Sequence, residues 1–131
     1  MVMPWCCQIE VLKRAKIRGF LTHCGWNSIL ESIWCEVPIF CFPLLTDQFT
    51  NRRLVVDDWK VVINGVNPVN RDEVLVNINR LMTGTLGGEL RNNIKRERKT
   101  LENEISTDGP SVRNLDTFID DVTETVCNNH D

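Results

Sequence analysis

The chain has 131 residues, of which 42% are hydrophobic and 25% are charged, the balance of a globular domain with its own core. Its net charge of −3 argues against a general binder of polyanions. No apolar run approaches the roughly 20 residues that a membrane span needs, and the N-terminus lacks the pattern of a signal peptide. We therefore expect no nucleic-acid partner, no membrane span and a cytoplasmic location.

Six cysteines are present, and five of them lie in the first 41 residues beside apolar neighbours. No Cys-x2-Cys spacing occurs, so the pattern does not predict a zinc site. We expect reduced thiols that act mainly as small buried apolar side chains, and no bound metal.

Short apolar runs alternate with helical patterns in the first half of the chain. The runs over 19–22, 37–43 and 59–64 predict buried strands. The segments 29–35 and 46–58 have helical character, and Thr46 or Asp47 is predicted to cap the second. Before them, Pro4 opens a loop that carries Trp5, a lone aromatic residue that reads either as core or as a flat platform for a ring.

From residue 70 onward the pattern is helical. Asn70 and Glu73 form a capping box, and Gly84 ends that helix. A second helix is predicted from about Gly88 to residue 105, and a last one runs from residue 111 with an apolar stripe. Alternating strands and helices predict an α/β fold with a parallel sheet, whose ligands bind at the carboxyl ends of the strands.

The turn His23-Cys24-Gly25-Trp26-Asn27-Ser28 follows the first predicted strand and opens the first helix. Such a turn presents free backbone N–H groups and the positive end of a helix dipole to an anion. Ser28 and Glu31 form a predicted capping box, so an ordinary capped turn is the alternative. Asp47 also follows a predicted strand, which places a second polar group at the same edge.

An ordered set of residues closely resembles the signature box of plant UDP-sugar glycosyltransferases. The resemblance spans 44 residues, from Trp5 to Gln48, without insertion. Later segments resemble the family too, so that nearly the whole chain is covered. The matching residues are Trp5-Cys6-Cys7-Gln8, Val11-Leu12, Phe20 to Ser28, Glu31, Val37-Pro38, Pro43, Asp47-Gln48, Asn51, Leu81-Met82, Gly84, Glu89-Leu90-Arg91, Asn114-Leu115-Asp116 and Phe118-Ile119.

The resemblance implies a role for each matching residue. Trp5 would stack on the uracil and the Cys6 backbone would bond its edge, whereas Gln8 and Glu31 would bond the ribose. The diphosphate would lie at the helix N-terminus, held by His23, Asn27, Ser28 and the backbone around Gly25. Trp26, Asp47 and Gln48 would face the sugar hydroxyls, and the final glutamine is typical of members that use UDP-glucose.

The resemblance also implies a fold of two Rossmann-like domains of the B type, with the active site between them. This chain would be a partial C-terminal nucleotide-sugar-binding domain over 1–131, with the signature box at 5–48 and C-terminal helices over 71–127. The catalytic base of the family lies in the N-terminal domain, so we expect no catalytic residue here. His23 is a diphosphate contact by this resemblance.

The function implied is inverting transfer of glucose from UDP-glucose to a small apolar acceptor, without a metal. The acceptor would be bound mainly by the N-terminal domain. The alternative is a truncated UDP-binding module without turnover. The resemblance implies a glycine at position 36, where it would end the helix with positive φ, and a histidine at position 14. This chain has Glu36 and Arg14 instead, and a glutamate at positive φ costs on the order of 1 kcal/mol.

Overall fold

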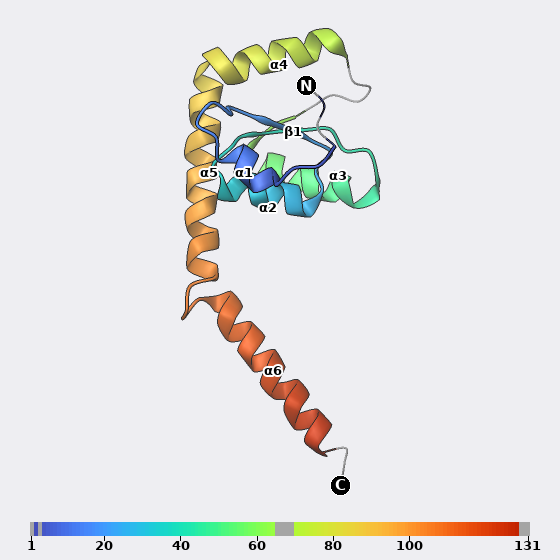
Figure 1. Cartoon of the computed structure of the whole chain (residues 1–131), viewed down its shortest axis with the longest axis vertical. Coiled ribbons are helices and arrows are strands. Elements are labelled where there is room, and N and C mark those ends of the chain that lie inside the picture. Colours follow the sequence, from blue (N-terminus) through green and yellow to red (C-terminus); the bar gives the residue numbers. More distant parts are fainter. Residues whose placement is uncertain (1, 3, 65–69, 129–131) are drawn as a thin grey trace. The chain divides into compact units, whose positions relative to one another are not determined.

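The computed structural model describes residues 2, 4–64 and 70–128 (Figure 1). The chain divides into two compact units, residues 1–98 and 99–131. The first unit holds the sheet and the helices around it. The expected organisation as one partial domain over 1–131 stays a prediction.

The sheet has three parallel strands in the order β1 (Phe20–Thr22), β2 (Ile39–Cys41) and β3 (Val62–Asn64). Leu21 pairs with Phe40, and Phe40 pairs with Ile63. This confirms the predicted α/β fold with a parallel sheet. Each strand is shorter than its apolar run, because Pro38 and Pro43 and the turn after Trp59 interrupt the ladder at its ends.

Six α-helices and one π-helical turn are present among the described residues. The predicted helices are confirmed within a few residues, but the first short helix was not predicted. The elements are α1 (Gln8–Leu12), α2 (Trp26–Trp34), α3 (Thr46–Arg53), η1 (Leu54–Asp58), α4 (Arg71–Thr83), α5 (Thr85–Glu104) and α6 (Pro110–Asn128).

Helices cover both faces of the sheet, with α4 on one side and α1, α2 and α3 on the other (Figure 1). On the α4 side, Phe40 and Ile63 pack with Leu81 and Leu90, all 6% exposed or less. Because side chains alternate along a strand, the neighbours of Phe40 in β2 face the opposite layer, where α2 buries its apolar residues. The central strand β2 is thus buried on both faces, as its continuous apolar run predicted, whereas Leu21 of the edge strand β1 is 60% exposed.

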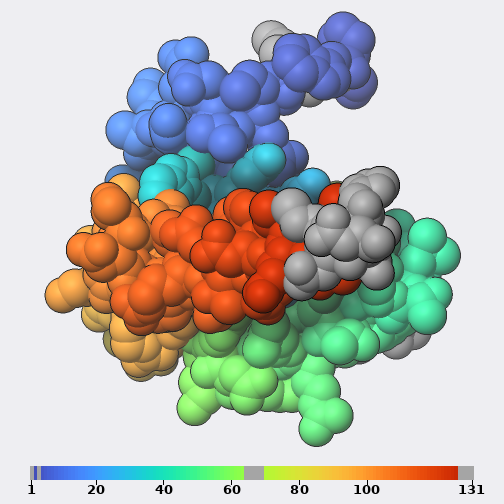
Figure 2. Space-filling view, turned by 90° about the horizontal axis from the view of Figure 1, so that it is seen from below, coloured from blue at the N-terminus to red at the C-terminus, as the bar shows by residue number. Residues whose placement is uncertain are grey.

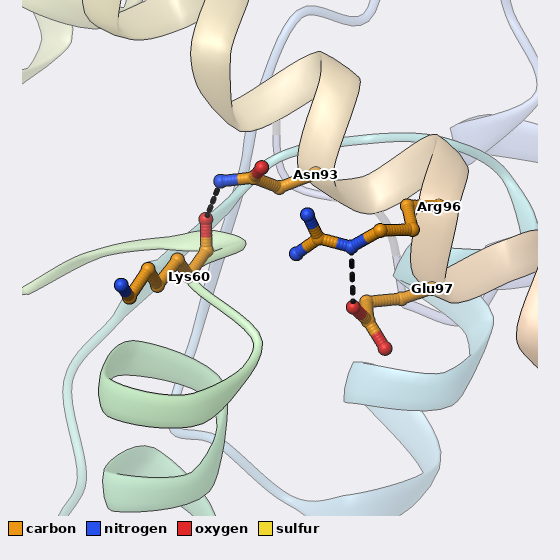
Figure 3. A network of polar contacts seen from close by, with 4 residues as sticks. All are labelled: Lys60, Asn93, Arg96 and Glu97. Atoms are coloured by element: carbon orange, nitrogen blue, oxygen red, sulfur yellow. Dashed lines mark hydrogen bonds and ion pairs between the residues drawn. The ribbon is translucent and has the colours of Figure 1, made fainter.

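Three non-glycine residues among the described ones have a left-handed backbone: Cys24 (φ 67°), Glu36 (φ 57°) and Lys60 (φ 54°). A side chain from a later helix holds each of them. The three contacts are Asn51 Nδ2 to the Cys24 carbonyl at 3.1 Å, Arg98 Nη1 to Glu36 Oε1 at 3.0 Å, and Asn93 Nδ2 to the Lys60 carbonyl at 2.9 Å (the last in Figure 3).

The expected positive φ at Glu36 is therefore confirmed. Arg98 pairs with its carboxylate and also lies over the Trp34 ring, 5.5 Å from the centroid. The ion pair and the cation–π contact offset the conformational cost of a glutamate in this position.

We expect Arg98→Ala to lower the free energy of unfolding by about 1 kcal/mol in the natural sequence, because each of the two part-exposed contacts contributes a fraction of that amount. In the Glu36→Gly background the same change is expected to cost less, since the ion pair is already lost. Urea titrations of the four proteins measure the difference. An equal effect of Arg98→Ala in both backgrounds would contradict the coupling.

The second unit consists of the end of α5 and of α6, and Ser111 Oγ donates to Glu104 Oε2 at 3.0 Å between them. The apolar stripe predicted for α6 is present at helical spacing, but its members are 44% to 63% exposed. Figure 2 looks onto the surface of this helix, coloured orange to red. The stripe comprises Leu115, Phe118, Ile119, Val122 and Val126.

Two of the cysteines are placed as predicted and two are not. Cys24 and Cys41 are buried as expected, and their side chains lie in contact between the end of β1 and β2, with Cα atoms 5.6 Å apart. Cys6 and Cys7 are exposed, because they lie in the loop before α1. Burial raises the pKa of the partly buried Cys35 thiol above its ordinary value, which disfavours the reactive thiolate.

Candidate nucleotide-binding site

The turn after β1 delivers the chain to the N-terminus of α2. Gly25 is the N-cap, in an extended conformation (φ −63°, ψ 139°), and its carbonyl accepts the N–H of Ile29 at 3.1 Å. No side chain caps the helix, so the prediction of a Ser28–Glu31 capping box is wrong. The N–H groups of the first turn have no intrahelical partner, which is the arrangement that binds an anion.

Ser28 and Glu31 instead meet a side chain from α1. Gln8 Nε2 donates to Glu31 Oε2 at 2.7 Å and contacts Ser28 Oγ at 3.3 Å. These contacts join residues 20 and 23 positions apart, so a local capping rule could not anticipate them. The Ser28 hydroxyl, which accepts this bond, keeps its O–H for donation to a ligand.

A cleft of about 570 Å³ opens beside this network. It brings together three of the residues predicted from the sequence: Gln8, His23 and Ser28. Its other walls are largely apolar and come from β1, from the loop after β2 and from α4; they are Phe20, Leu21, Thr22, Phe42, Leu44 and Val74. The cleft thus lies at the carboxyl end of β1 and β2, where the sequence predicted a ligand.

Gly25 also has a steric role at this turn. A Cβ built on it would lie 2.7 Å from Nε2 of the exposed His23 ring, so a side chain at residue 25 would displace that ring. The glycine therefore lets the imidazole lie directly beside the helix N-terminus.

The start of α3 forms the other polar part of this edge. Gln48 Oε1 accepts the backbone N–H groups of Leu44 and Leu45 at 2.8 and 2.9 Å. Gln48 therefore caps the helix, and the prediction that Thr46 or Asp47 does so is wrong. Gln48 is 8% exposed, whereas Asp47 is exposed in the first turn.

The remaining predicted contacts are surface residues. Trp5 is 82% exposed in the loop before α1, so the reading of Trp5 as core is wrong. Cys6 and Asn27 are also exposed. Trp26 is 42% exposed and its ring lies 6.0 Å from that of Trp59.

No group of three or more His, Cys, Asp or Glu side chains lies close enough together to hold a metal ion, within the part of the chain that is described. Likewise, no helix over residues 4–64 and 70–128 is both long and apolar enough to cross a membrane.

A parallel sheet with an uncapped helix N-terminus and a cleft at the carboxyl ends of its strands is the arrangement of a ligand-binding α/β protein. Within that class, residues 1–96 match the family model described as UDP-glucoronosyl and UDP-glucosyl transferase, and the chain belongs to this family. The resemblance drawn from the signature box is confirmed.

Curated relatives from plants agree with this membership. The chain is 55% identical over 123 residues to UDP-glycosyltransferase 86A2 and 50% identical over 124 residues to UDP-glycosyltransferase 86A1, both of Arabidopsis thaliana. The matches cover 91% and 93% of this chain. They cover 25% of each relative, so the chain spans about a quarter of their length.

Solved structures share the fold. The Os79 protein of O. sativa, in complex with U2F and trichothecene, matches with a TM-score of 0.84 and 32% identity, over 90% of this chain and 28% of its own. UGT2 of Phytolacca americana, complexed with UDP-2fluoro-glucose and pterostilbene, matches with a TM-score of 0.82 and 33% identity. The match covers 89% of this chain and 28% of UGT2. The predicted fold class, a part of a two-domain B-type glycosyltransferase, is confirmed.

Proposed function

We propose that this chain is the donor-binding segment of a glycosyltransferase that uses UDP-glucose. The reaction proposed is inverting transfer to a small apolar acceptor, which is bound mainly by an N-terminal domain outside this chain. The observation that carries the proposal is the Gln8–Ser28–Glu31 network, which joins the proposed ribose and diphosphate contacts beside an uncapped helix N-terminus.

The arrangement supports a division of the donor site into subsites. Glu31 has a second carboxylate oxygen to accept ribose hydroxyls while Gln8 fixes the first. The N–H groups at the start of α2, with the Ser28 hydroxyl, would face the diphosphate and stabilise it as a leaving group. The Asp47 carboxylate and the Gln48 Nε2 amide would face the sugar hydroxyls.

Calorimetric titration with UDP tests the donor site directly. We expect saturable binding to the 131-residue chain at concentrations up to millimolar, with a matching rise in thermal stability. Titration with EDTA present is expected to give the same affinity, since no metal is proposed. Absence of both heat and thermal shift would reject donor binding by this chain.

The alternative is a truncated UDP-binding module without turnover. It is favoured by one observation, the left-handed backbone (φ 57°) of Glu36 at a position where the family resemblance implies a glycine. Release of glucose from UDP-glucose, or its transfer to a simple phenol, would argue against this alternative, whereas UDP binding without turnover would support it. The proposed cytoplasmic location is tested separately by fractionation of cells that express the natural protein.

Trp5→Ala is expected to lower the affinity for UDP by about 5- to 100-fold, since stacking of a base on an aromatic ring contributes about 1–3 kcal/mol. Because Trp5 is 82% exposed, the free energy of unfolding should stay within about 0.5 kcal/mol of the natural value. Calorimetry and urea titration measure the two quantities. Trp5→Phe, which keeps a ring, is the control and should retain most of the affinity.

Asp47→Ala is expected to lower the affinity for UDP-glucose by about 10-fold and to change the affinity for UDP by no more than about twofold. The reason is that the carboxylate is proposed to bond only the sugar. Competition between the two ligands on the same protein measures the ratio of its affinities for UDP-glucose and UDP. Thr50→Ala, another exposed position of α3, is the control. Equal weakening of both ligands would remove Asp47 from the sugar subsite.

A further inference from the structure

We propose that Asn51 is a positioning residue that ties the diphosphate turn to the helix that carries the sugar contacts. Asn51 resembles a family residue in sequence, but the resemblance assigned it no role. The inference rests on the proposed function, which supplies the ligands UDP and UDP-glucose. The position of Asn51 itself comes from contacts within this chain.

The turn that Asn51 holds has a left-handed residue at its centre. Cys24 is wholly buried and has a φ of 67°, a conformation that L-amino acids with a Cβ rarely adopt without support from their surroundings. Asn51 Nδ2 donates to the Cys24 carbonyl at 3.1 Å. The bond therefore holds the peptide plane between Cys24 and Gly25, immediately before the free N–H groups of α2.

The other end of the bond lies on α3. Asp47 and Asn51 are separated by four positions, so both side chains lie on one face of this helix. Because Asn51 points to the Cys24 carbonyl, that face is turned toward the diphosphate turn. One hydrogen bond thus aligns the proposed sugar contacts with the proposed diphosphate contacts across 27 residues of sequence.

The chain contains a matched control for this bond. Asn93 Nδ2 donates to the carbonyl of Lys60, whose φ is 54°, at 2.9 Å (Figure 3). The donor group, the acceptor group and the left-handed backbone are the same, but the Asn93–Lys60 bond is exposed whereas the Asn51–Cys24 bond is part-buried. Lys60, however, precedes β3, and so it lies toward the amino end of the sheet, opposite the cleft. A loss of stability alone should therefore leave the ratio of UDP to uridine affinity unchanged in both variants.

The experiment compares Asn51→Ala with Asn93→Ala in the 131-residue chain, by calorimetry with uridine, UDP and UDP-glucose. For Asn51→Ala we expect the affinity for UDP to fall by about 3- to 10-fold relative to the affinity for uridine, because the loss of one neutral hydrogen bond misaligns the turn. The affinity for UDP-glucose should fall by at least as much. For Asn93→Ala the ratio of UDP to uridine affinity should be unchanged. An unchanged ratio in Asn51→Ala, or the same change in both variants, would overturn the proposal.

Hydrogen–deuterium exchange provides a readout that does not depend on a ligand. We expect the amides of residues 24–28 to exchange about 3- to 10-fold faster in Asn51→Ala and at the natural rate in Asn93→Ala. If the natural chain binds no UDP, the proposed function fails, and exchange still decides the role of Asn51. If Asn51→Ala does not fold, Asn51→Ser takes its place, because the serine hydroxyl is too short to reach the Cys24 carbonyl. Amide exchange over residues 24–28 at the rate of the natural chain would overturn the proposal.

Discussion

Replacement of Glu31 by alanine is expected to weaken UDP binding by about 10- to 100-fold, because hydrogen bonds to a charged group contribute about 1.5–3 kcal/mol. The variant loses the proposed ribose acceptor and also the shorter of the two hydrogen bonds that hold Gln8, from its Nε2 to Glu31 Oε2 at 2.7 Å. Both effects remove preorganised polar groups from the same subsite. Calorimetric titration with UDP and with uridine measures the loss, which should be the same for both ligands.

Glu31→Gln is the control for shape, since it keeps a carbonyl oxygen but loses the charge. Its affinity should lie between those of the natural chain and Glu31→Ala. Glu10→Ala removes an exposed carboxylate of α1 and should leave the affinity for UDP unchanged. Retention of natural UDP affinity by Glu31→Ala would reject the ribose role.

Ile33→Ala is expected to lower the free energy of unfolding by about 2–5 kcal/mol, the range for a fully buried isoleucine. Ile33 is 0% exposed on the face of α2 that packs on the sheet, so its truncation leaves a cavity beneath the helix that carries the donor turn. Urea titration followed by circular dichroism measures the change. Leu75→Ala, a 58% exposed position of α4, should change stability by less than about 0.5 kcal/mol.

The strands and the longer helices could be predicted because their signals are local. The apolar runs of β2 and its neighbours, and the Asn70 cap, whose side chain accepts the Asp72 N–H at 2.9 Å, depend on residues close in sequence. The short helix α1 has only five residues, too few for a periodic pattern. The interiors of the strands and of the longer helices were thus predictable, whereas α1 and the ends of the other elements depended on tertiary contacts.

The candidate nucleotide-binding site also depends on tertiary contacts that a local sequence pattern does not predict. The signature-box resemblance predicted the donor contacts, and three of these residues, Gln8, His23 and Ser28, line one cleft. The partner of Glu31, however, is a side chain 23 residues earlier rather than a backbone group one turn away. A capping pattern and a binding pattern use the same residue types, and only the packing of α1 on α2 distinguishes them.

The pairing of Glu36 with Arg98 has a consequence for the residues that position 36 tolerates. The family resemblance places glycine at position 36, and the stabilising partner of Glu36 lies 62 residues later in the chain. A glutamate introduced without that arginine would incur the full cost of the left-handed backbone. Positions 36 and 98 are therefore energetically coupled, and the cost of the residue at position 36 depends on which residue occupies position 98.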